Sequence, residues 1–387
     1  MKRVALLVDA AADLPYPELQ DQTPMQQARL PFARELAGEG RCGALRRLRP
    51  EADASRALLA EICGVPEAVA RDLRWGPMAA SSLGLPLSAD RVYVLAGFVS
   101  IDENHVQNPV HPSSMEEQKH LLEDLQQGLS EVDGKQVELH SLSLGRFVMV
   151  LQGGEGEVWP RTVVQYGHQN FLKRLPSRLN ALLQQAESTL RDHPVNTVRL
   201  DLGEAPVDGL WCWSGGANVV EPEPQPFRQA LVTQDPLAEG MAKMWNRTLL
   251  KMENPYTLSR PDAGFDVFQM MQVLENHDEV VIWVPAPFSS RKFEGSSEKV
   301  RRLDAVDYYV TGPVKAILEE MQPSRLLLLA AGVRHRGRPE RGAAPFVLWG
   351  EGMASDSCQG WTEIDCAQGS LGTPKVKKLL EIFRKET

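Results

Sequence analysis

The sequence has few cysteines and no C-x-x-C pair. Its five cysteines are an odd number and are scattered along the chain, so the spacing indicates neither a disulfide framework nor a structural zinc site. They are Cys42, Cys63, Cys212, Cys358 and Cys366. This usage is typical of a protein in a reducing compartment, and we expect a cytoplasmic location.

Long hydrophobic runs are also lacking near the N-terminus. The first apolar stretch extends only from Val4 to Val8 before Asp9 interrupts it. A signal-peptide core or a membrane-spanning helix needs a longer run. We therefore expect neither export nor a membrane segment.

Basic residues are outnumbered by acidic ones, 42 against 51, which gives a formal charge of −9. Binding to a phosphate backbone needs clustered Lys and Arg, so nucleic acid is not an expected partner. What is present is an ordinary globular composition, with 43% hydrophobic and 24% charged residues. At 387 residues the chain is long enough for two domains, or for one domain with a large insertion.

Short apolar runs alternate with helical patterns, which predicts an α/β fold with a doubly wound, mostly parallel sheet. The predicted strands are 3–8, 92–96, 147–151, 209–213, 230–233, 280–284, 326–330 and 346–349. The predicted helices are 25–36, 115–129, 170–190, 267–274, 298–321 and 376–383. The first strand ends in Asp9, and open α/β sheets bind their ligands at that edge.

Two stretches resemble domain boundaries. Residues 66–90 are rich in loop signals, and residues 221–226 read Glu-Pro-Glu-Pro-Gln-Pro, which is typical of a stiff linker. We predict a core domain made of residues 1–66 and 227–387. A smaller α/β domain, residues 67–226, is inserted between these two parts.

Three sequence blocks resemble one known family. The first is LLVDAAADLPYPELQDQTPMQQARLPFARELAGEGRCG, which begins at Leu6. The second is DHPVN at residues 192–196, followed by Trp211 and Trp213 at the family spacing, and the third is RWGPMAASSLGLPL at residues 74–87. Together they are similar to the 2,3-bisphosphoglycerate-independent phosphoglycerate mutases of archaeal type, and the resemblance extends from the first strand to the last.

This resemblance implies an alkaline-phosphatase-like architecture, in which a metal-binding core carries an inserted substrate-clamping domain. The family activity is an isomerisation of glycolysis. It uses two divalent cations, manganese or zinc, and a serine that carries the phosphoryl group. The cations neutralise charge on the phosphate and lower the pKa of the serine.

Asp9 lies at the position of the family's first carboxylate ligand, which makes it a vestigial metal ligand; the alternative is a turn or a helix cap. Ser55 lies at the position of the nucleophile, nine residues before Gly64. The glycine, the acid and the tyrosine that accompany this serine in the family are missing, so a helix N-cap is the alternative role.

Other metal ligands are replaced. Where the family has an Asp and a His after the strand at 280–284, this chain has Phe288 and Lys292, which cannot hold a hard cation. Glu294 is the nearest replacement. No Asp lies between Leu326 and Gly350, and His335 is the only imidazole there.

On the substrate side, Arg146 matches a family arginine. His193 keeps its place within DHPVN, where it could equally fix the loop by hydrogen bonding. The arginines 334, 336, 338 and 341 could bind an anion, although such a run is more often a solvated loop.

Three functions follow. The first is a pseudoenzyme that keeps the fold as a binding or regulatory module for a small phosphorylated or anionic ligand and needs no metal cofactor. The second is an active mutase or phosphate-ester transferase or hydrolase with an altered pair of divalent cations, using Asp9, Ser55, and Glu294 or His335. The third is a protein partner of an active paralogue, binding through apolar residues. Candidates for that surface are Trp211-Cys212-Trp213 and Met270-Met271.

Overall fold

The computed structural model describes residues 1–47, 54–102, 105–132, 134–153, 177–217, 220–258, 264–286, 295–336 and 338–385. The chain divides into two compact units. Unit 1 comprises Met1–Leu73 and Glu221–Thr387, and unit 2 comprises Arg74–Val220. The sequence places the boundaries at 66/67 and 226/227. The first division lies later because helix α4 (Glu67–Asp72) packs against α3 (Ala54–Ile62) of unit 1.

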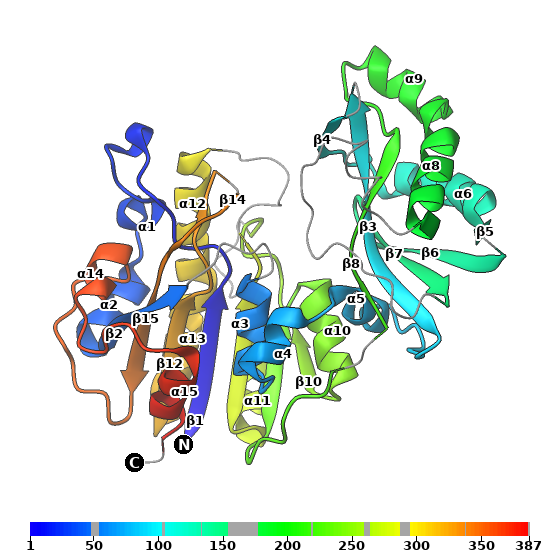
Figure 1. Ribbon diagram of the computed structural model, residues 1–387. Coiled ribbons are helices and arrows are strands. Elements are labelled where there is room, and N and C mark those ends of the chain that lie inside the picture. The colour runs from blue at the N-terminus through cyan, green and yellow to red at the C-terminus, as the bar shows by residue number, and fades with distance from the viewer. Residues whose placement is uncertain are drawn as a thin grey trace. The chain divides into compact units, whose positions relative to one another are not determined.

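Unit 1 is built, within the described residues, on a seven-stranded sheet of order β10-β9-β11-β1-β12-β15-β2 (Figure 1). The strands are β1 (Lys2–Val8), β2 (Arg41–Arg47), β9 (Gln229–Thr233), β10 (Thr248–Lys251), β11 (Glu279–Val284), β12 (Ser324–Ala330) and β15 (Gly342–Gly350). β15 runs antiparallel to both of its neighbours, β12 and β2, and the other six of these strands all run in one direction. The predicted mostly parallel sheet is therefore confirmed.

Helices cover both faces of this sheet, which is why β1, β11 and β12 are buried along almost their whole length and carry continuous hydrophobic runs at 4–8, 280–284 and 326–330. On one face, Val4, Leu6 and Val8 share a core with α2 (Pro31–Glu39), α11 (Val267–Asn276), α12 (Ser296–Val306) and α13 (Gly312–Glu320). On the other, α15 (Val376–Arg384) packs against α3 and β12, and α10 (Pro236–Met244) packs against β9 (Figure 1).

Two predicted helices are interrupted at prolines. The predicted helix at 25–36 is instead α1 (Pro24–Gln27) and α2, because Leu30 precedes Pro31 and leaves the helical region. The predicted helix at 298–321 is α12, a π-helical turn η2 (Asp307–Thr311) and α13. Pro313 has no N–H to donate, so the regular α pattern does not continue through it.

The π-helical turn supplies a cap for α2. Leu30 at the start of α2 has no capping side chain, and the Asp307 carboxylate accepts the backbone N–H groups of Phe32 and Ala33 at 3.0 and 2.9 Å instead. Burial raises the pKa of Asp307 to about 7, although these two hydrogen bonds act in the opposite direction. The folded chain therefore favours the protonated carboxyl group.

We expect the Asp307→Asn variant to remove part of the pH dependence of stability. Because the folded pKa lies above the unfolded one, the contribution of Asp307 is fully present below about pH 4 and is lost as the pH rises through about 7. The unfolding free energy of the natural chain minus that of the variant should fall by up to about 4 kcal/mol over this window. Denaturant unfolding at several pH values measures it, and a constant difference would contradict the assignment.

Unit 2 contains an antiparallel sheet, which within the described residues has the order β4-β3-β7-β6-β5, with β8 paired to β3. Its strands are β3 (Arg91–Asp102), β4 (His105–Pro109), β5 (Glu131–Val132), β6 (Lys135–Ser143), β7 (Arg146–Gln152) and β8 (Gly209–Gly216). Helices α6 (Met115–Leu129) and α8 (Ser177–Arg191) share its core. Helix α5 (Trp75–Ser82) also packs against β3 and β8, and α9 (Pro194–Asp201) follows α8.

The apolar residues suggested as a partner surface are mainly core. Trp211 and Cys212 belong to the core of unit 2, and Met270 belongs to that of unit 1. Trp213 and Met271 are partly buried against the same two cores. These residues therefore give no exposed docking surface.

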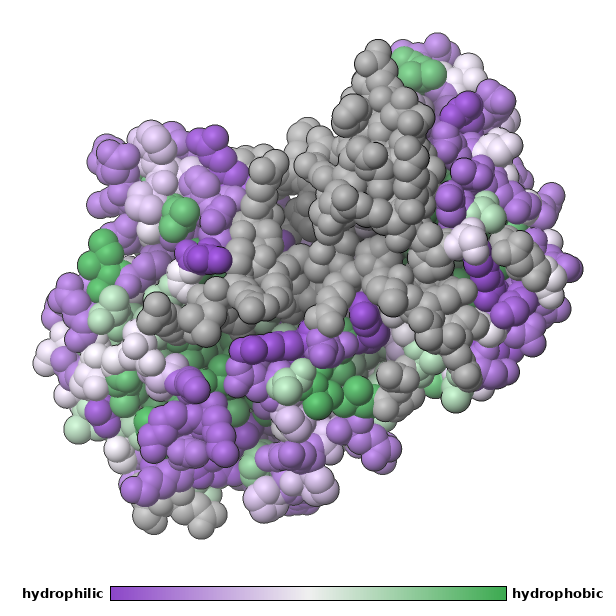
Figure 2. Space-filling view, viewed as in Figure 1, coloured by the Kyte–Doolittle hydropathy of each residue, from purple (hydrophilic) through white to green (hydrophobic). Residues whose placement is uncertain are grey.

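The visible face of the described residues is mainly hydrophilic, with scattered hydrophobic side chains (Figure 2). Scattered exposure of this kind is normal for a folded protein. No helix in the described ranges combines the length and hydrophobicity that crossing a membrane requires.

Candidate functional site

Asp9 lies at the carboxyl edge of the unit 1 sheet, between the ends of three strands. It follows β1, its backbone N–H donates to Val284 of β11 at 2.9 Å, and Ala331 after β12 donates to Val8 at 2.8 Å. The side chain is only 4% exposed. Its Oδ1 is buried and has no hydrogen-bond partner among the described residues. A buried carboxylate oxygen in this condition is a strong candidate for contact with a ligand.

Ala10 adopts a left-handed backbone conformation with φ of 53° and is buried. Glycine reaches positive φ without the steric cost that a Cβ brings, and here that cost falls on an alanine. The turn that presents Asp9 is therefore strained.

The strain should be relieved in the Ala10→Gly variant. We expect the unfolding free energy to rise by about 1 kcal/mol. The matched control is Ala11→Gly, because Ala11 is equally buried and is not among the residues with positive φ. The control should lose about 1 kcal/mol, and equal losses in both variants would contradict the strain at Ala10.

Ser55 reaches the same edge from the first turn of α3. It is buried, with 6% exposure, and its Oγ lies 2.8 Å from where a Cβ on Gly332 would stand. The backbone nitrogen of Ala10 lies 4.0 Å from that same point. Gly332 follows β12 and Ala10 follows Asp9, so the serine hydroxyl lies over the ends of β1 and β12. This is not the position of a solvated N-cap.

Tyr256 is a further side chain at this edge. Its hydroxyl donates to the carbonyl of Pro285, directly after β11, at 2.7 Å. Burial raises the pKa of Tyr256 well above its usual value, and the charge of Asp9 raises it further. Arg302 lies over the tyrosine ring at 5.8 Å. The phenol is therefore close to Asp9 and remains protonated at neutral pH.

Asp13 lies at the centre of a buried polar network. Its Oδ2 accepts from Lys299 Nζ at 2.7 Å and from the Tyr16 hydroxyl at 3.1 Å, and its Oδ1 lies 3.1 Å from His335 Nδ1. Glu363 joins the network by accepting the backbone N–H of Asp13 and the hydroxyl of Thr23. Burial lowers the pKa of Lys299, and the Asp13 carboxylate acts against that shift. The network fixes the turn that follows Asp9.

The metal site implied by the family resemblance does not fit the described residues. Asp9 belongs to no group of three or more His, Cys, Asp or Glu that could hold an ion, as far as the described residues extend. The end of β12 provides Ala331 and Gly332, and one ring nitrogen of His335 already contacts Asp13. Phe288, Lys292 and Glu294 lie outside the described residues, so their predicted roles remain expectations.

In unit 2, His193 holds the start of α9. Its Nδ1 accepts the N–H of Val195 at 3.2 Å, and its Nε2 lies 2.8 Å from Asp124 Oδ2. Both ring nitrogens are therefore engaged within the unit. These contacts match the loop-fixing alternative that the sequence allows, and substrate binding by His193 stays a prediction.

Arg146 begins β7, where it pairs with Gly97 of β3 and with Ser143 of β6. Its side chain is half-buried, and its carbonyl oxygen lies 3.4 Å from Gln118 Nε2. Substrate binding by Arg146 also remains a prediction.

Sequence reasoning overlooked Tyr256, Lys299 and Glu363 as site residues. Tyr256 follows Asn254-Pro255, a turn signal just after the short strand β10, and this signal could have indicated a strand end. Lys299 lies on the buried side of an amphipathic helix, where a lone lysine needs an acidic partner. Nothing in the local sequence places Glu363 beside Asp13, 350 residues away.

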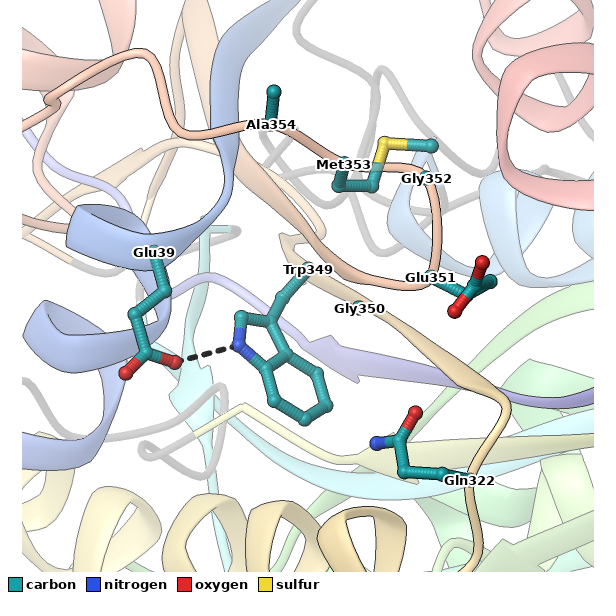
Figure 3. Close-up of a pocket in the computed structure, with 8 residues that line it drawn as sticks. All are labelled: Glu39, Gln322, Trp349, Gly350, Glu351, Gly352, Met353 and Ala354. Carbon is teal, nitrogen blue, oxygen red and sulfur yellow. Dashed lines mark hydrogen bonds between the residues drawn. The ribbon is translucent and has the colours of Figure 1, made fainter.

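A shallow pocket of about 540 Å³ lies at the opposite edge of the sheet, lined by Glu39, Gln322, Trp349 and residues 350–354. Figure 3 shows Trp349 turned toward Glu39, to which its Nε1 donates at 2.8 Å. Gly350 pairs with Arg325 near the start of β12, whereas Asp9 follows Val8, which pairs with Ala330 at the end of β12. The pocket is thus separate from the edge that carries Asp9 and Ser55.

Comparison with known proteins gives consistent results. Residues 75–196 match the family model of 2,3-bisphosphoglycerate-independent phosphoglycerate mutase. A relative of that name from Methanothermobacter thermautotrophicus is 26% identical, and the alignment covers 99% of this chain and 97% of the relative. A probable enzyme of the same name from Geobacter sulfurreducens is 25% identical, with 99% of each chain covered.

Two solved structures share the fold. A Pyrococcus horikoshii protein superposes with a TM-score of 0.70 at 17% identity, covering 100% of this chain and 98% of that one. The cofactor-independent phosphoglycerate mutase from Thermoplasma acidophilum gives 0.55 at 18% identity, with 99% of each chain covered. The predicted α/β fold class is thereby confirmed. The chain is thus similar along its whole length to the 2,3-bisphosphoglycerate-independent phosphoglycerate mutases, and its residues 75–196 match the model of that family.

Proposed function

We propose that this chain keeps the mutase scaffold as a binding or regulatory module for a small phosphorylated or anionic ligand, with little or no metal-dependent mutase turnover. One observation carries the proposal. Asp9 stands where the family has its first metal ligand, yet the described residues near it provide no set of donors for an ion. Function depends on the site rather than on the fold, so the preserved scaffold does not by itself imply catalysis.

The chemistry of phosphoryl transfer explains why the missing donors matter. A serine hydroxyl is a weak nucleophile at neutral pH and needs a base or a cation to activate it. Beside Ser55 the end of β12 provides an alanine and a glycine, neither of which has a side chain able to accept the proton. Tyr256 cannot serve as the base, because burial and the Asp9 charge keep its phenol protonated.

The alternative is an active mutase, or a phosphate-ester transferase or hydrolase with an altered metal site. The position of Ser55 favours it, because the hydroxyl is buried over the strand ends that carry Asp9. The names of the full-length relatives also favour it. In that case the two divalent cations of the family would be required, and residues beyond the described ranges would have to complete the site.

Turnover of 3-phosphoglycerate, followed by phosphorus NMR with added manganese or zinc, separates the two functions. We expect binding of 3-phosphoglycerate in calorimetry and no conversion to 2-phosphoglycerate above the rate without protein. The matched variants are Ser55→Ala and Ser324→Ala, since Ser324 is equally buried but lies at the opposite edge of the sheet. Conversion that Ser55→Ala abolishes and Ser324→Ala preserves would establish the active enzyme instead.

A further inference from the structure

Three of the five cysteines converge in unit 1. Cys42 lies on β2, Cys358 in the segment after β15, and Cys366 on the short helix α14 (Glu363–Ala367). Their three Sγ atoms all lie within 4.8 Å of one another, and all three side chains are buried. Cys63 and Cys212 are outside this cluster. The convergence is invisible in the sequence, because the cysteines come from three separate segments.

Asp356 holds two of the three segments in place. Its Oδ2 accepts the backbone N–H of Cys42 at 2.9 Å, and its Oδ1 lies 3.3 Å from the N–H of Cys358. The carbonyl of Gly360 lies 3.4 Å from Cys358 Sγ and 3.6 Å from Cys366 Sγ. The sulfur positions are thus determined by backbone contacts.

The cluster lies where the C-terminal segment runs along the edge strand of the sheet. β2 is the last strand in the sheet order, and residues 369–372 lie along it, with Leu371 donating to Cys42 and Gly372 accepting from Ala44. Gly369 packs so closely on Cys42 that a Cβ there would lie 2.3 Å from its carbonyl oxygen. A crosslink among the three sulfurs would therefore tie residues 356–372 to β2.

A single buried cysteine usually acts as a small apolar side chain. Three that face one another form a soft donor set, which suits thiophilic cations of filled d shell, zinc(II) and copper(I). Zinc–sulfur bonds of about 2.3 Å would place the sulfurs about 3.8 Å apart. Two sulfur atoms at the upper limit of 4.8 Å would therefore have to approach each other by only about 1 Å.

We propose that Cys42, Cys358 and Cys366 together bind one thiophilic cation, which locks the C-terminal segment onto the edge of the sheet. Binding forms three metal–sulfur bonds and breaks three S–H bonds, and the protons leave to solvent. Cys358 gives the ion a way in, because at 9% exposure it is the least buried of the three. The proposal does not depend on whether the chain is a mutase, since this site is built from other residues than Asp9 and Ser55.

Metal loading of the reduced full-length protein tests the site. The protein is stripped, incubated anaerobically with zinc(II) or copper(I) in separate arms, and analysed by elemental mass spectrometry. Cobalt(II) in place of zinc reports sulfur ligation through its thiolate charge-transfer absorption, which oxygen ligands at Asp9 would not give. We expect one ion per chain in at least one arm and a higher Tm in the loaded protein.

Matched variants identify the ligands. Cys42→Ser, Cys358→Ser and Cys366→Ser should each weaken binding at least tenfold, while Cys63→Ser and Cys212→Ser keep it. Cys366→Ala replaces the serine variant if the hydroxyl disturbs packing, and circular dichroism verifies that each variant folds. The proposal is overturned if neither ion binds, if zinc binds but cobalt in its place shows no thiolate absorption, if the cluster variants bind normally, or if protein from reducing cells carries a disulfide within the cluster.

Discussion

The Asp13→Ala variant should lose about 3–5 kcal/mol of stability, because it leaves a buried ammonium without its counter-ion. Asp13 and Lys299 side chains are each 1% exposed, and their charged atoms are 2.7 Å apart. Without the carboxylate, Lys299 keeps its hydrogen bond to the carbonyl of Ala12 at 3.1 Å, and no other side chain within the described ranges is seen to accept from it. Denaturant unfolding monitored by circular dichroism should show the loss in the transition of unit 1.

Two further variants make this prediction specific. Adding Lys299→Met to Asp13→Ala should recover part of the loss, since the uncompensated charge is then removed. Glu67→Ala breaks an ion pair with Arg71 whose side chains are more than half exposed, and it should cost less than about 1 kcal/mol. If the double variant were no more stable than Asp13→Ala, the buried charge would not be the cause.

The Asn196→Ala variant should destabilise unit 2 by about 3–5 kcal/mol, because it leaves three buried backbone groups without their hydrogen-bond partner. The Asn196 amide donates to the carbonyls of Leu190 and Val207, both at 2.8 Å, and its oxygen accepts the N–H of Val207 at 2.7 Å. These bonds join the end of α8 to the segment before β8.

Gln127→Ala on α6 is the control in the same unit, since Gln127 is exposed and its loss should change stability by no more than about 0.5 kcal/mol. Limited proteolysis followed by mass spectrometry locates the destabilised unit. Equal resistance of both variants within Arg74–Val220 would show that the Asn196 bonds are not important for unit 2.

Much of the fold could be predicted because the main signals are local. Strands β1, β11 and β12 carry continuous apolar runs, and the helices at 115–129 and 376–383 have clear amphipathic periods. The short strand β2 was missed because its charged sequence, RCGALRR, lacks that signal. The interruptions at Pro31 and Pro313 were overlooked although proline marks both.

The site was harder to predict because its members come from distant segments. Asp9 could be identified from its place after a strand, and the structure adds the unpartnered oxygen that makes it a candidate. The closeness of Ser55 to Gly332, and of three cysteines to one another, depends on tertiary packing that no spacing in the sequence encodes. Within the DHPVN block, His193 caps α9 and Asn196 anchors it to the segment before β8, and the substrate-binding role of His193 stays a prediction.

Manganese binding to the full-length chain, measured by electron paramagnetic resonance, tests the central claim that the two-metal site is lost. Manganese prefers oxygen and imidazole ligands, so the cysteine cluster should not contribute to the signal. We expect no tightly bound pair of ions, and the same weak binding in the natural chain and in Asp9→Asn. Two manganese ions held tightly by the natural chain and released in Asp9→Asn would contradict the account.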